Sequence, residues 1–267
     1  MPKVSVVMAI NKYTPYLHKA INSILNQSFT DFEFIIIANG CDDDLFSELK
    51  LYEQMDKRIV LHRTKLGGFA FALNYGINIA KAEYIARMDG DDICSFDRLE
   101  KQYSILNENQ SISLLGTACK FIGPDDEELP NRQFKSITDN ESIRNCLPYK
   151  NPIVHASIMC KKSILMSVGG YKYGLMSEDH ELFIRLARDN KIIFMNMVER
   201  LYSYRRHELQ ITDLSKSKEN YCQISAFLFS EFLLTHNYKY LLGILRVHPY
   251  IRTIYSLIKR RGKKNGA

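Results

Sequence analysis

Short apolar runs alternate with longer amphipathic stretches over the first ninety residues, and this alternation is the strongest indication of the fold. The apolar runs are rich in β-branched residues and have the length of buried strands; they cover residues 4–10, 32–38, 58–62 and 83–88. The stretches between them place apolar side chains at helical spacing and cover residues 16–27, 45–55 and 67–80. Strands and helices in alternation form right-handed βαβ units. The sequence therefore predicts an α/β fold, with a mostly parallel central sheet and helices on both faces.

Polar side chains follow two of these predicted strands. Asn39 comes directly after the second run, and Asp89, Asp91 and Asp92 come within four residues after the fourth. In mostly parallel sheets, ligands bind beyond the carboxyl ends of the strands. Carboxylates this close repel one another unless a cation or a donor lies between them, and their oxygens suit Mg²⁺ or Mn²⁺. The alternative is a solvated turn that is rich in Asp.

The second half of the chain is less regular. Helices are expected at residues 98–107, 179–188 and 221–234, strands within 113–122 and at 158–161 and 192–197, and a polar loop at 123–131. We expect one half of the fold to cover residues 1–110 and the other 111–210, followed by a C-terminal helical and basic segment at 211–267.

Further candidate residues lie in this second half, and each has a functional and a structural interpretation. Glu178 and Asp179 begin an amphipathic segment, where one carboxylate is either a general base or an ordinary helix cap. His155 either binds a ligand or is a partly buried histidine with a protein partner. Arg205 and His207 follow a predicted strand; they either meet a diphosphate, with His207 also in reach of a metal, or only cover the surface.

Composition excludes several classes of protein. Hydrophobic residues at 46% and charged residues at 25% are typical of globular domains and exclude a disordered chain. The six Cys form no C-x-x-C, which argues against a zinc ribbon and a disulfide framework and favours a reducing compartment. The motifs of serine hydrolases, zinc proteases, P-loop proteins and dinucleotide-binding proteins are absent. Neither a signal peptide nor a membrane-spanning stretch is recognised, so a cytoplasmic protein is expected.

The positive charge belongs to the C-terminal end. The net charge is +6, yet residues 232–267 hold eight basic residues and no acidic one. The rest of the chain is slightly acidic, which gives no support to nucleic-acid binding. Residues 238–264 mix Leu, Ile and Tyr with cations, a pattern that favours peripheral attachment to an anionic membrane, at about 1 kcal/mol per basic residue. The alternative is a helix packed on the domain with a frayed basic end.

Nine segments taken together resemble one enzyme family. They are VSVVMAIN, AINSILNQSF, FEFIIIANG, LGGFAFALNYGINIAKAEYIARMDGDD, RLEKQ, NPIVHASIM, VGGY, SEDHELFIRL and YRRH, in this order along residues 2–207. The chain resembles the inverting family 2 glycosyltransferases of the GT-A fold, a group that includes bacterial polysaccharide and O-antigen transferases. The resemblance implies transfer of a hexosyl residue from a nucleotide sugar, expected to be a UDP-sugar, with Mn²⁺ or Mg²⁺ as cofactor. The implied acceptor is a glycan, lipid-linked if the tail binds the inner membrane face.

The resemblance also implies roles for single residues. Asp179 would be the general base, and the neighbouring Glu178 would help to orient the acceptor. The metal would be held by Asp92, with Asp91 and His207 as further candidate ligands and Asp89 supporting the site. Asp91 would also lie near the ribose. The remaining contacts to the nucleotide sugar would come from Ala9, Asn11, Asn39, His155 and Arg205. Residues 1–110 would thus bind the donor, and 111–210 would bind the acceptor and carry the base.

The chain departs from the family pattern in two places. Family members often carry Asp near the glycine that ends the second strand, where this chain has Ala38 before Asn39. They also commonly have Trp in the helix of the base, whereas this chain has no Trp and places His180 and Phe183 there. Two other functions stay open at this point: a nucleotidyltransferase, which also uses paired Asp and a metal, and a catalytically silent module that binds sugar nucleotides or membranes.

Overall fold

The computed structural model of the chain describes residues 1–134, 136–172, 176–207 and 217–248. Within them, nine strands form one sheet in the order β3-β2-β1-β4-β8-β6-β9-β5, with β7 paired to β6. The strands are β1 (Val4–Ile10), β2 (Phe32–Asn39), β3 (Ile59–Thr64), β4 (Tyr84–Arg87), β5 (Ile93–Cys94), β6 (Ile112–Ile122), β7 (Glu128–Gln133), β8 (Met159–Lys161) and β9 (Ile193–Arg205). The pairs β3–β2, β2–β1, β1–β4 and β6–β9 are parallel. The short strands β5, β7 and β8 pair antiparallel to their neighbours, so the predicted mostly parallel sheet is confirmed.

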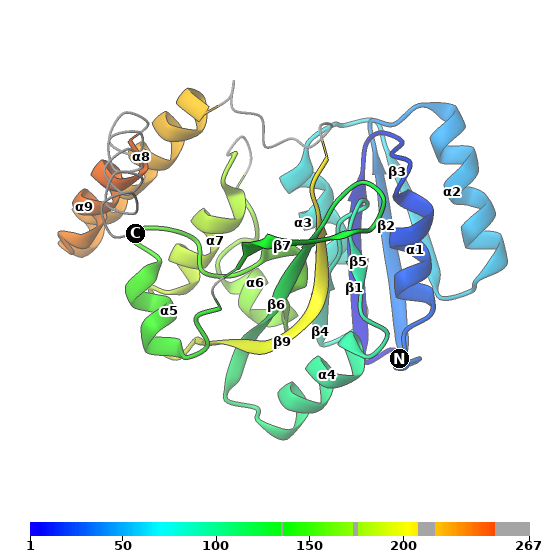
Figure 1. Cartoon of the computed structure of the whole chain (residues 1–267), viewed down its shortest axis with the longest axis horizontal. Helices are drawn as coiled ribbons and strands as arrows, with labels where there is room; N and C mark the ends of the chain where they lie inside the picture. The colour runs from blue at the N-terminus through cyan, green and yellow to red at the C-terminus, as the bar shows by residue number, and fades with distance from the viewer. Residues whose placement is uncertain (135, 173–175, 208–216, 249–267) are drawn as a thin grey trace, which may run out of the picture.

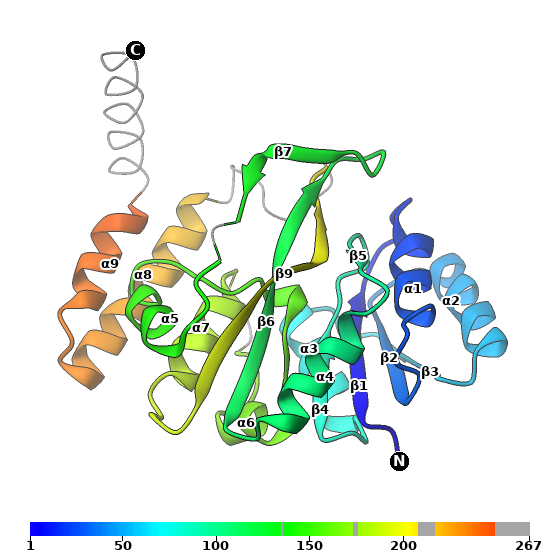
Figure 2. The same ribbon diagram turned by 60° about the horizontal axis from the view of Figure 1, so that its bottom comes forward.

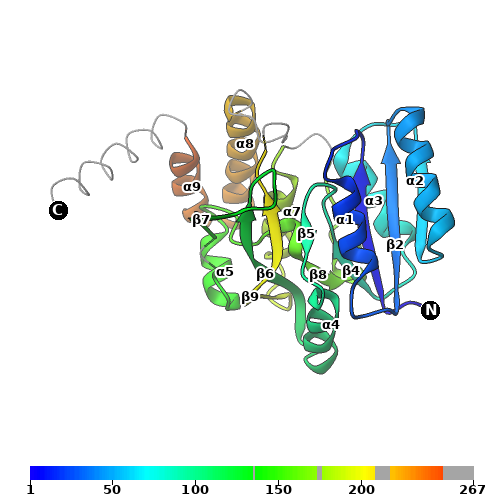
Figure 3. The ribbon, with the colours of Figure 1, turned by 45° about the vertical axis from the view of Figure 1, so that its right-hand side comes forward.

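Helices cover both faces of this sheet (Figures 1 and 3). The helices are α1 (Leu17–Leu25), α2 (Asp43–Met55), α3 (Phe69–Ile79), α4 (Arg98–Glu108), α5 (Asn140–Cys146), α6 (Lys162–Ser167), α7 (Glu178–Leu186), α8 (Ser217–Thr235) and α9 (Lys239–Val247). Apolar side chains of α1, α2 and α4 form one core cluster with one face of the sheet. Those of α3, α5, α6, α7 and α8 form a second cluster on the other face.

Strand β1 shows why its sequence is apolar without interruption. Its side chains alternate between the two clusters: Val4, Val6 and Met8 belong to the first and Val7 to the second. All four are buried. A parallel strand covered on both faces needs apolar residues at successive positions, which is the pattern that predicted the strand.

Two elements of the second half differ from the prediction. Strand β9 joins the strand expected at residues 192–197 to the one expected just before Arg205, because it stays paired with β6 through several register shifts. The stretch expected to be a polar loop contains the start of β7, which pairs with β6 and lies at the top of Figure 2. Its polar composition and Pro130 concealed it, since Pro is tolerated on an edge strand.

Helix α4 ties together the strands that lead to the acidic turn. The buried Arg98 donates from Nη2 to the carbonyl of Arg87 at 2.8 Å and from Nε to Oε1 of Gln102 at 2.9 Å. Gln102 in turn donates from Nε2 to the carbonyls of Leu115 and Ser157, at 2.9 and 3.0 Å. The RLEKQ segment therefore fixes the end of β4 relative to β6 and to the turn before β8.

The C-terminal part of the described chain is helical, as expected. Helices α8 and α9 pack against each other at the end of the molecule opposite to α2 (Figure 1). No helix in the described part of the chain is long and apolar enough to cross a membrane. The basic tail beyond residue 248 lies outside the described residues, and the expected boundaries at 110 and 210 stay predictions.

Candidate active site

The acidic turn follows β4, at the carboxyl edge of the parallel strands. Asp89 accepts a hydrogen bond from Nη2 of Arg87 at 2.6 Å. Arg87 is buried, and its guanidinium lies 4.9 Å from the ring centroid of Phe69. This ion pair fixes the first carboxylate of the turn.

Asp91 and His207 form a pair across the two halves of the sheet. Oδ2 of Asp91 lies 2.9 Å from Nε2 of His207, and the histidine ring packs 4.9 Å from the ring of Tyr16. Burial and the neighbouring Asp89 raise the pKa of Asp91, whereas His207 opposes that shift. The end of β9 and the acidic turn thus place a carboxylate oxygen and an imidazole nitrogen at one point.

Asp92 occupies a different environment from Asp91. Its side chain is buried, and Oδ1 accepts a hydrogen bond from the backbone N–H of Arg205 at 2.7 Å. Burial, followed by the charges of Asp91 and Asp89, raises its pKa well above the ordinary value for Asp. In this structure the carboxyl of Asp92 anchors β9 to the turn, and its assignment as the principal metal ligand stays a prediction.

Arg205 is also placed differently from the expectation. Its fully buried guanidinium donates to the carbonyl oxygens of Asp91 and Gly123, both at 2.8 Å, and pairs with Asp126 at 2.5 Å. These bonds, together with its contact over the ring of Tyr16, turn the side chain toward the protein. Arg205 therefore holds the acidic turn to the β6–β7 connection, and its contact with a diphosphate stays a prediction.

The second acidic pair, Glu178 and Asp179, lies in the first turn of α7. Ser177 occupies the cap position, so Asp179 is not the helix cap. Oδ2 of Asp179 accepts from Nδ2 of Asn151 at 2.8 Å, and Oδ1 accepts from the backbone N–H of His180 at 2.7 Å. The N-terminal end of a helix favours a negative charge. Asp179 is therefore held as an oriented carboxylate.

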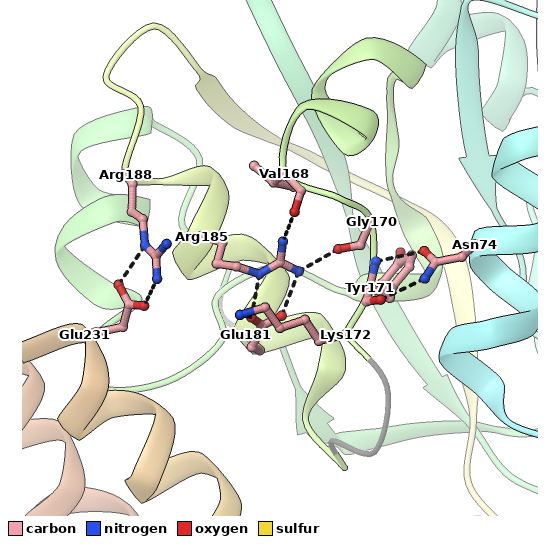
Figure 4. Close-up of polar contacts among 9 residues, drawn as sticks. All are labelled: Asn74, Val168, Gly170, Tyr171, Lys172, Glu181, Arg185, Arg188 and Glu231. Atoms are coloured by element: carbon pink, nitrogen blue, oxygen red, sulfur yellow. Dashed lines mark hydrogen bonds and ion pairs between the residues drawn. The ribbon is translucent and has the colours of Figure 1, made fainter. Parts of the chain in front are cut away.

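A buried ion pair fixes α7 against the VGGY segment (Figure 4). Arg185 binds the carboxylate of Glu181 at 2.5 and 2.8 Å, and donates to the carbonyls of Val168 and Gly170 at 2.5 and 2.6 Å. Asn74 of α3 brackets the next residue, Tyr171: Nδ2 donates to its carbonyl and Oδ1 accepts from its N–H. The helix that carries Asp179 is thus positioned by a charged pair that is nearly inaccessible to water.

Glycine is required at position 170 in this arrangement. Its φ is +67°, a conformation that residues with a Cβ rarely adopt, and a Cβ there would collide with the amide of Asn74. Gly170 therefore allows Asn74 to approach the backbone of the VGGY segment closely.

The histidines near α7 are both held by protein groups. Nε2 of the half-buried His155 lies 2.6 Å from the hydroxyl of Tyr171. Burial and the positive charge of Arg87 lower its pKa well below the ordinary value, so the ring is neutral. His180, at one of the positions expected to substitute for Trp, is buried with Nε2 on the carbonyl of Leu147 at 2.7 Å. It therefore turns toward the end of α5, whereas Phe183 packs against the ring of His155.

The three predicted contacts to the nucleotide lie at the carboxyl ends of β1 and β2. Ala9 is half-buried and Asn11 is exposed. Asn39 is buried, and its Nδ2 donates to the carbonyl of Gly68 at 3.3 Å, which ties β2 to the loop before α3. These positions share one edge of the sheet with the acidic turn.

Comparison with known proteins identifies the family. The family model described as Glycosyl transferase family 2 matches residues 5–169 of the chain, which include the acidic turn and the NPIVHASIM sequence. The chain belongs to glycosyltransferase family 2. The family assignment makes this protein a glycosyltransferase enzyme, which argues against the nucleotidyltransferase and the silent module.

A curated relative supports this assignment, and two solved structures share the fold. The O-antigen biosynthesis glycosyltransferase WbnJ of Escherichia coli is 35% identical over 232 residues, which cover 86% of this chain and 89% of WbnJ. S. aureus TarS in complex with UDP-GlcNAc has a TM-score of 0.68 at 16% identity, over 86% of this chain and 66% of that chain. The mannosyltransferase PcManGT from Pyrobaculum calidifontis, in complex with GDP-Man and Mn²⁺, has a TM-score of 0.68 at 13% identity, over 100% of this chain and 76% of that chain. At such low identities the two structures show the fold alone, and they confirm the expected GT-A fold.

The carboxyl of Glu178 interacts electrostatically with its neighbour Asp179 and with Asp89 of the acidic turn. Burial, then the charge of Asp179, raises the pKa of Glu178 to about 8; Arg87 opposes the shift and Asp89 adds to it. Asp89 belongs to the turn after β4, so the turn and the start of α7 lie within electrostatic reach of each other. Glu178 is accordingly protonated at pH 7.

Replacing Glu178 by Gln is expected to remove a pH dependence of stability. The folded protein raises the pKa of Glu178 from 4.5 to about 8, so it retains a proton that the unfolded chain releases. The stabilisation from this protonated group is complete below pH 4.5, the pKa of Glu178 in the unfolded chain. It is lost as the pH rises through about 8, the pKa in the folded protein. Urea unfolding between about pH 5 and 9 should show wild-type stability falling relative to Glu178→Gln. A constant difference between the two proteins would contradict this pKa.

Several residues that build the site had no assigned role in the sequence analysis. Asn151 orients Asp179, Arg87 holds Asp89, and Arg98 with Gln102 fixes the strand ends. Asn151, Arg98 and Gln102 stand in the segments NPIVHASIM and RLEKQ, which carried the family resemblance. The family resemblance therefore drew attention to the segments of these residues. It did not reveal their roles, because the groups that they contact are remote in the sequence.

Proposed function

We propose that this glycosyltransferase transfers a hexosyl residue, with inversion, from a UDP-sugar to a lipid-linked glycan acceptor during the assembly of a surface polysaccharide. The name of WbnJ supports the polysaccharide context, and the complex of TarS supports a UDP-sugar. The acceptor would be presented at the cytoplasmic face of the inner membrane. The observation that carries the proposal is that this family 2 fold holds two oriented acidic groups: Asp91 beside His207 in the turn after β4, and Asp179 bonded to Asn151 at the start of α7.

The donor set at the acidic turn fits a divalent cation bound together with a diphosphate. Asp91 supplies an oxygen and His207 a nitrogen, 2.9 Å apart, and both ligand types suit Mn²⁺. In the described part of the chain no group of three or more His, Cys, Asp and Glu side chains could hold a metal ion. A cation at this pair would therefore complete its shell with diphosphate oxygens and water, as Mg²⁺ and Mn²⁺ do in nucleotide sites. When bound, it would neutralise the charge that develops on the leaving diphosphate.

Asp179 is the proposed general base. Its carboxylate accepts the proton of the acceptor hydroxyl while that oxygen attacks the anomeric carbon. The bond from this carbon to the diphosphate oxygen breaks as the new bond forms on the opposite face, which inverts the configuration. Asn151 and the N-terminal end of α7 keep the carboxylate oriented, and general-base assistance of this kind contributes about 10²–10⁴-fold to the rate.

Glu178 has a complementary role in this proposal. Its protonated carboxyl does not compete with Asp179 for the proton at pH 7, and it is able to donate a hydrogen bond to the acceptor. His155, kept neutral by burial and by Arg87, lies beside the same helix and would contact the donor sugar.

The nucleotide is the part of the donor that the carboxyl ends of β1 and β2 would hold. Ala9 and Asn11 would flank the base, and the amide of Asn39, which can both donate and accept hydrogen bonds, would stand where the family often has Asp. An amide of this kind suits the edge of uracil. The domain of residues 1–110 would thus bind UDP, and 111–210 would present the acceptor to Asp179.

Calorimetry with nucleotides tests this function. UDP, GDP, CMP and dTDP are titrated into the purified protein, each with and without Mn²⁺. We expect heat of binding for UDP in the presence of Mn²⁺ and much weaker binding without it. Binding of GDP in preference to UDP would refute the donor class, and equal binding with and without Mn²⁺ would refute the metal role.

A further inference from the structure

Helix α8 exposes an apolar face to the outside of the molecule. Its solvent-facing side chains include Cys222, Ala226, Phe229 and Leu233, spaced four, three and four residues apart, so that they follow one face of the helix. Phe229 is 49% and Leu233 56% exposed. Between residues 222 and 235 no exposed side chain is charged. An ordinary surface helix carries its charged residues on the outer face.

Three polar groups of α8 are directed toward the body of the protein. Glu231 is fully buried and forms an ion pair with Arg188 at the end of α7 (Figure 4). Near the other end of α8, Asn220 accepts a hydrogen bond from the hydroxyl of Ser177 at 2.6 Å. Gln223 accepts from the backbone N–H of Met176 at 2.8 Å. The helix is therefore held firmly to the segment that carries Asp179, and its apolar outer face does not result from loose docking.

Helix α9 continues this apolar surface. Tyr238, Leu242 and Leu245 are spaced four and three residues apart and are 64%, 45% and 54% exposed. Gly243 packs so closely on the body of the protein that a Cβ there would collide with the carbonyl of Pro148. The outward residues of α8 and α9 named above are called the apolar face of α8–α9 below. Exposed apolar side chains gathered on two packed helices are typical of an interaction site.

The charge of the C-terminal sequence favours an anionic partner for this face. Helix α9 carries Lys239 and Arg246 and no acidic residue. The sequence from residue 232 to the C-terminus adds six further cations and no anion. A second copy of the chain would bring two such cationic surfaces together, and like charges across an interface are unfavourable. An anionic bilayer instead accepts apolar side chains below its headgroups and attracts Lys and Arg at its surface.

We propose that the apolar face of α8–α9 inserts into the headgroup region of an anionic membrane. This inference rests on the proposed function only in so far as a lipid-linked acceptor gives the contact its purpose. The contacts of Ser177, Met176 and Arg188 with α8 join the membrane-bound helix directly to both ends of α7. Binding through this face holds the proposed base, Asp179, near the membrane surface from which a lipid-linked acceptor would extend.

Co-sedimentation with vesicles tests this surface in the full-length chain. The double variant Leu233→Glu/Leu242→Glu places two charges on the face and leaves the basic C-terminal sequence intact. Its matched control is Leu51→Glu on α2, where the wild-type side chain is 58% exposed at the opposite end of the molecule. With vesicles of phosphatidylglycerol and phosphatidylethanolamine, we expect the double variant to bind more than about tenfold more weakly. The control should bind as wild type, and phosphatidylcholine vesicles should bind wild type weakly.

The outcomes separate this proposal from its rivals. Binding of the double variant at the wild-type level would assign the membrane contact to the basic sequence alone and overturn the proposal. A wild-type dimer in light scattering that becomes monomeric in the double variant, without vesicle binding by wild type, would assign the face to a second copy. Titration of UDP with Mn²⁺ into the double variant reports on the nucleotide site independently of the vesicles. A loss of vesicle binding with unchanged UDP binding therefore supports the proposal even if the acceptor is not a lipid.

Discussion

Replacing Asp179 by Asn is expected to lower the rate of sugar transfer by about 10²–10⁴-fold, the contribution of a general base, and to leave donor affinity unchanged. Asn has the shape of Asp and keeps an oxygen that accepts from Asn151 or from the N–H of His180, the two groups that hold the wild-type carboxylate. It cannot take up the proton of the acceptor hydroxyl. Initial transfer rates at saturating donor measure the effect.

The matched control for this variant is Asp189→Asn. Asp189 is exposed beyond the end of the same helix and accepts a hydrogen bond from the N–H of Lys191 at 2.8 Å, which an Asn oxygen can also accept. The control should transfer sugar at the wild-type rate. If Asp179→Asn retained more than a tenth of that rate, the base would have to be sought elsewhere.

Replacing Asp91 by Asn is expected to abolish the Mn²⁺ dependence of UDP binding and to weaken that binding more than about 100-fold. Changes to groups that merely support a metal ligand already reduce metal affinity by about 10–100-fold, and Asp91 is proposed as a ligand itself. With the carboxylate removed, His207 is the one remaining member of the pair. Titration of UDP into the variant with and without Mn²⁺ measures both effects.

Two further variants make this result specific. Asp125→Asn removes an exposed carboxylate from the connection between β6 and β7 and should leave UDP binding unchanged. Asp92→Asn should weaken binding less than Asp91→Asn, because Asp92 is buried and bonded to the backbone of Arg205. Loss of Mn²⁺ dependence in Asp92→Asn, together with its retention in Asp91→Asn, would return the metal to Asp92.

The sheet, and the acidic turn at the carboxyl ends of its strands, could be predicted because each is encoded by residues that are consecutive in the sequence. The apolar run of β1 and the cluster of Asp after β4 are read directly from consecutive residues. The direction of parallel strands then brings the end of β4 and the end of β1 to one edge. The same reasoning found Asp179, since a carboxylate at the start of an amphipathic helix is also a local pattern.

The contacts that the sequence did not reveal join residues that are remote in the sequence. Asp92 is bonded to the backbone of Arg205, 113 residues away, and Arg205 reaches Asp126 across 79 residues. Asn151 contacts Asp179 across 28 residues, and Asn74 contacts Tyr171 across 97. Nothing in the local sequence distinguishes Asp91, which faces His207, from Asp92, which faces the core. The apolar outer face of α8 was likewise concealed, because a helix that is apolar on several faces does not indicate which face is buried.

The central claim is a division of labour between the two acidic groups: Asp91 with His207 binds the diphosphate through a cation, and Asp179 removes the proton of the acceptor. Titration of UDP and Mn²⁺ into Asp91→Asn and Asp179→Asn side by side tests it most directly. The account predicts that Asp179→Asn binds UDP as tightly as wild type, with the same dependence on Mn²⁺, and that Asp91→Asn does not. Equal loss of UDP binding in both variants, or equal retention, would contradict that division.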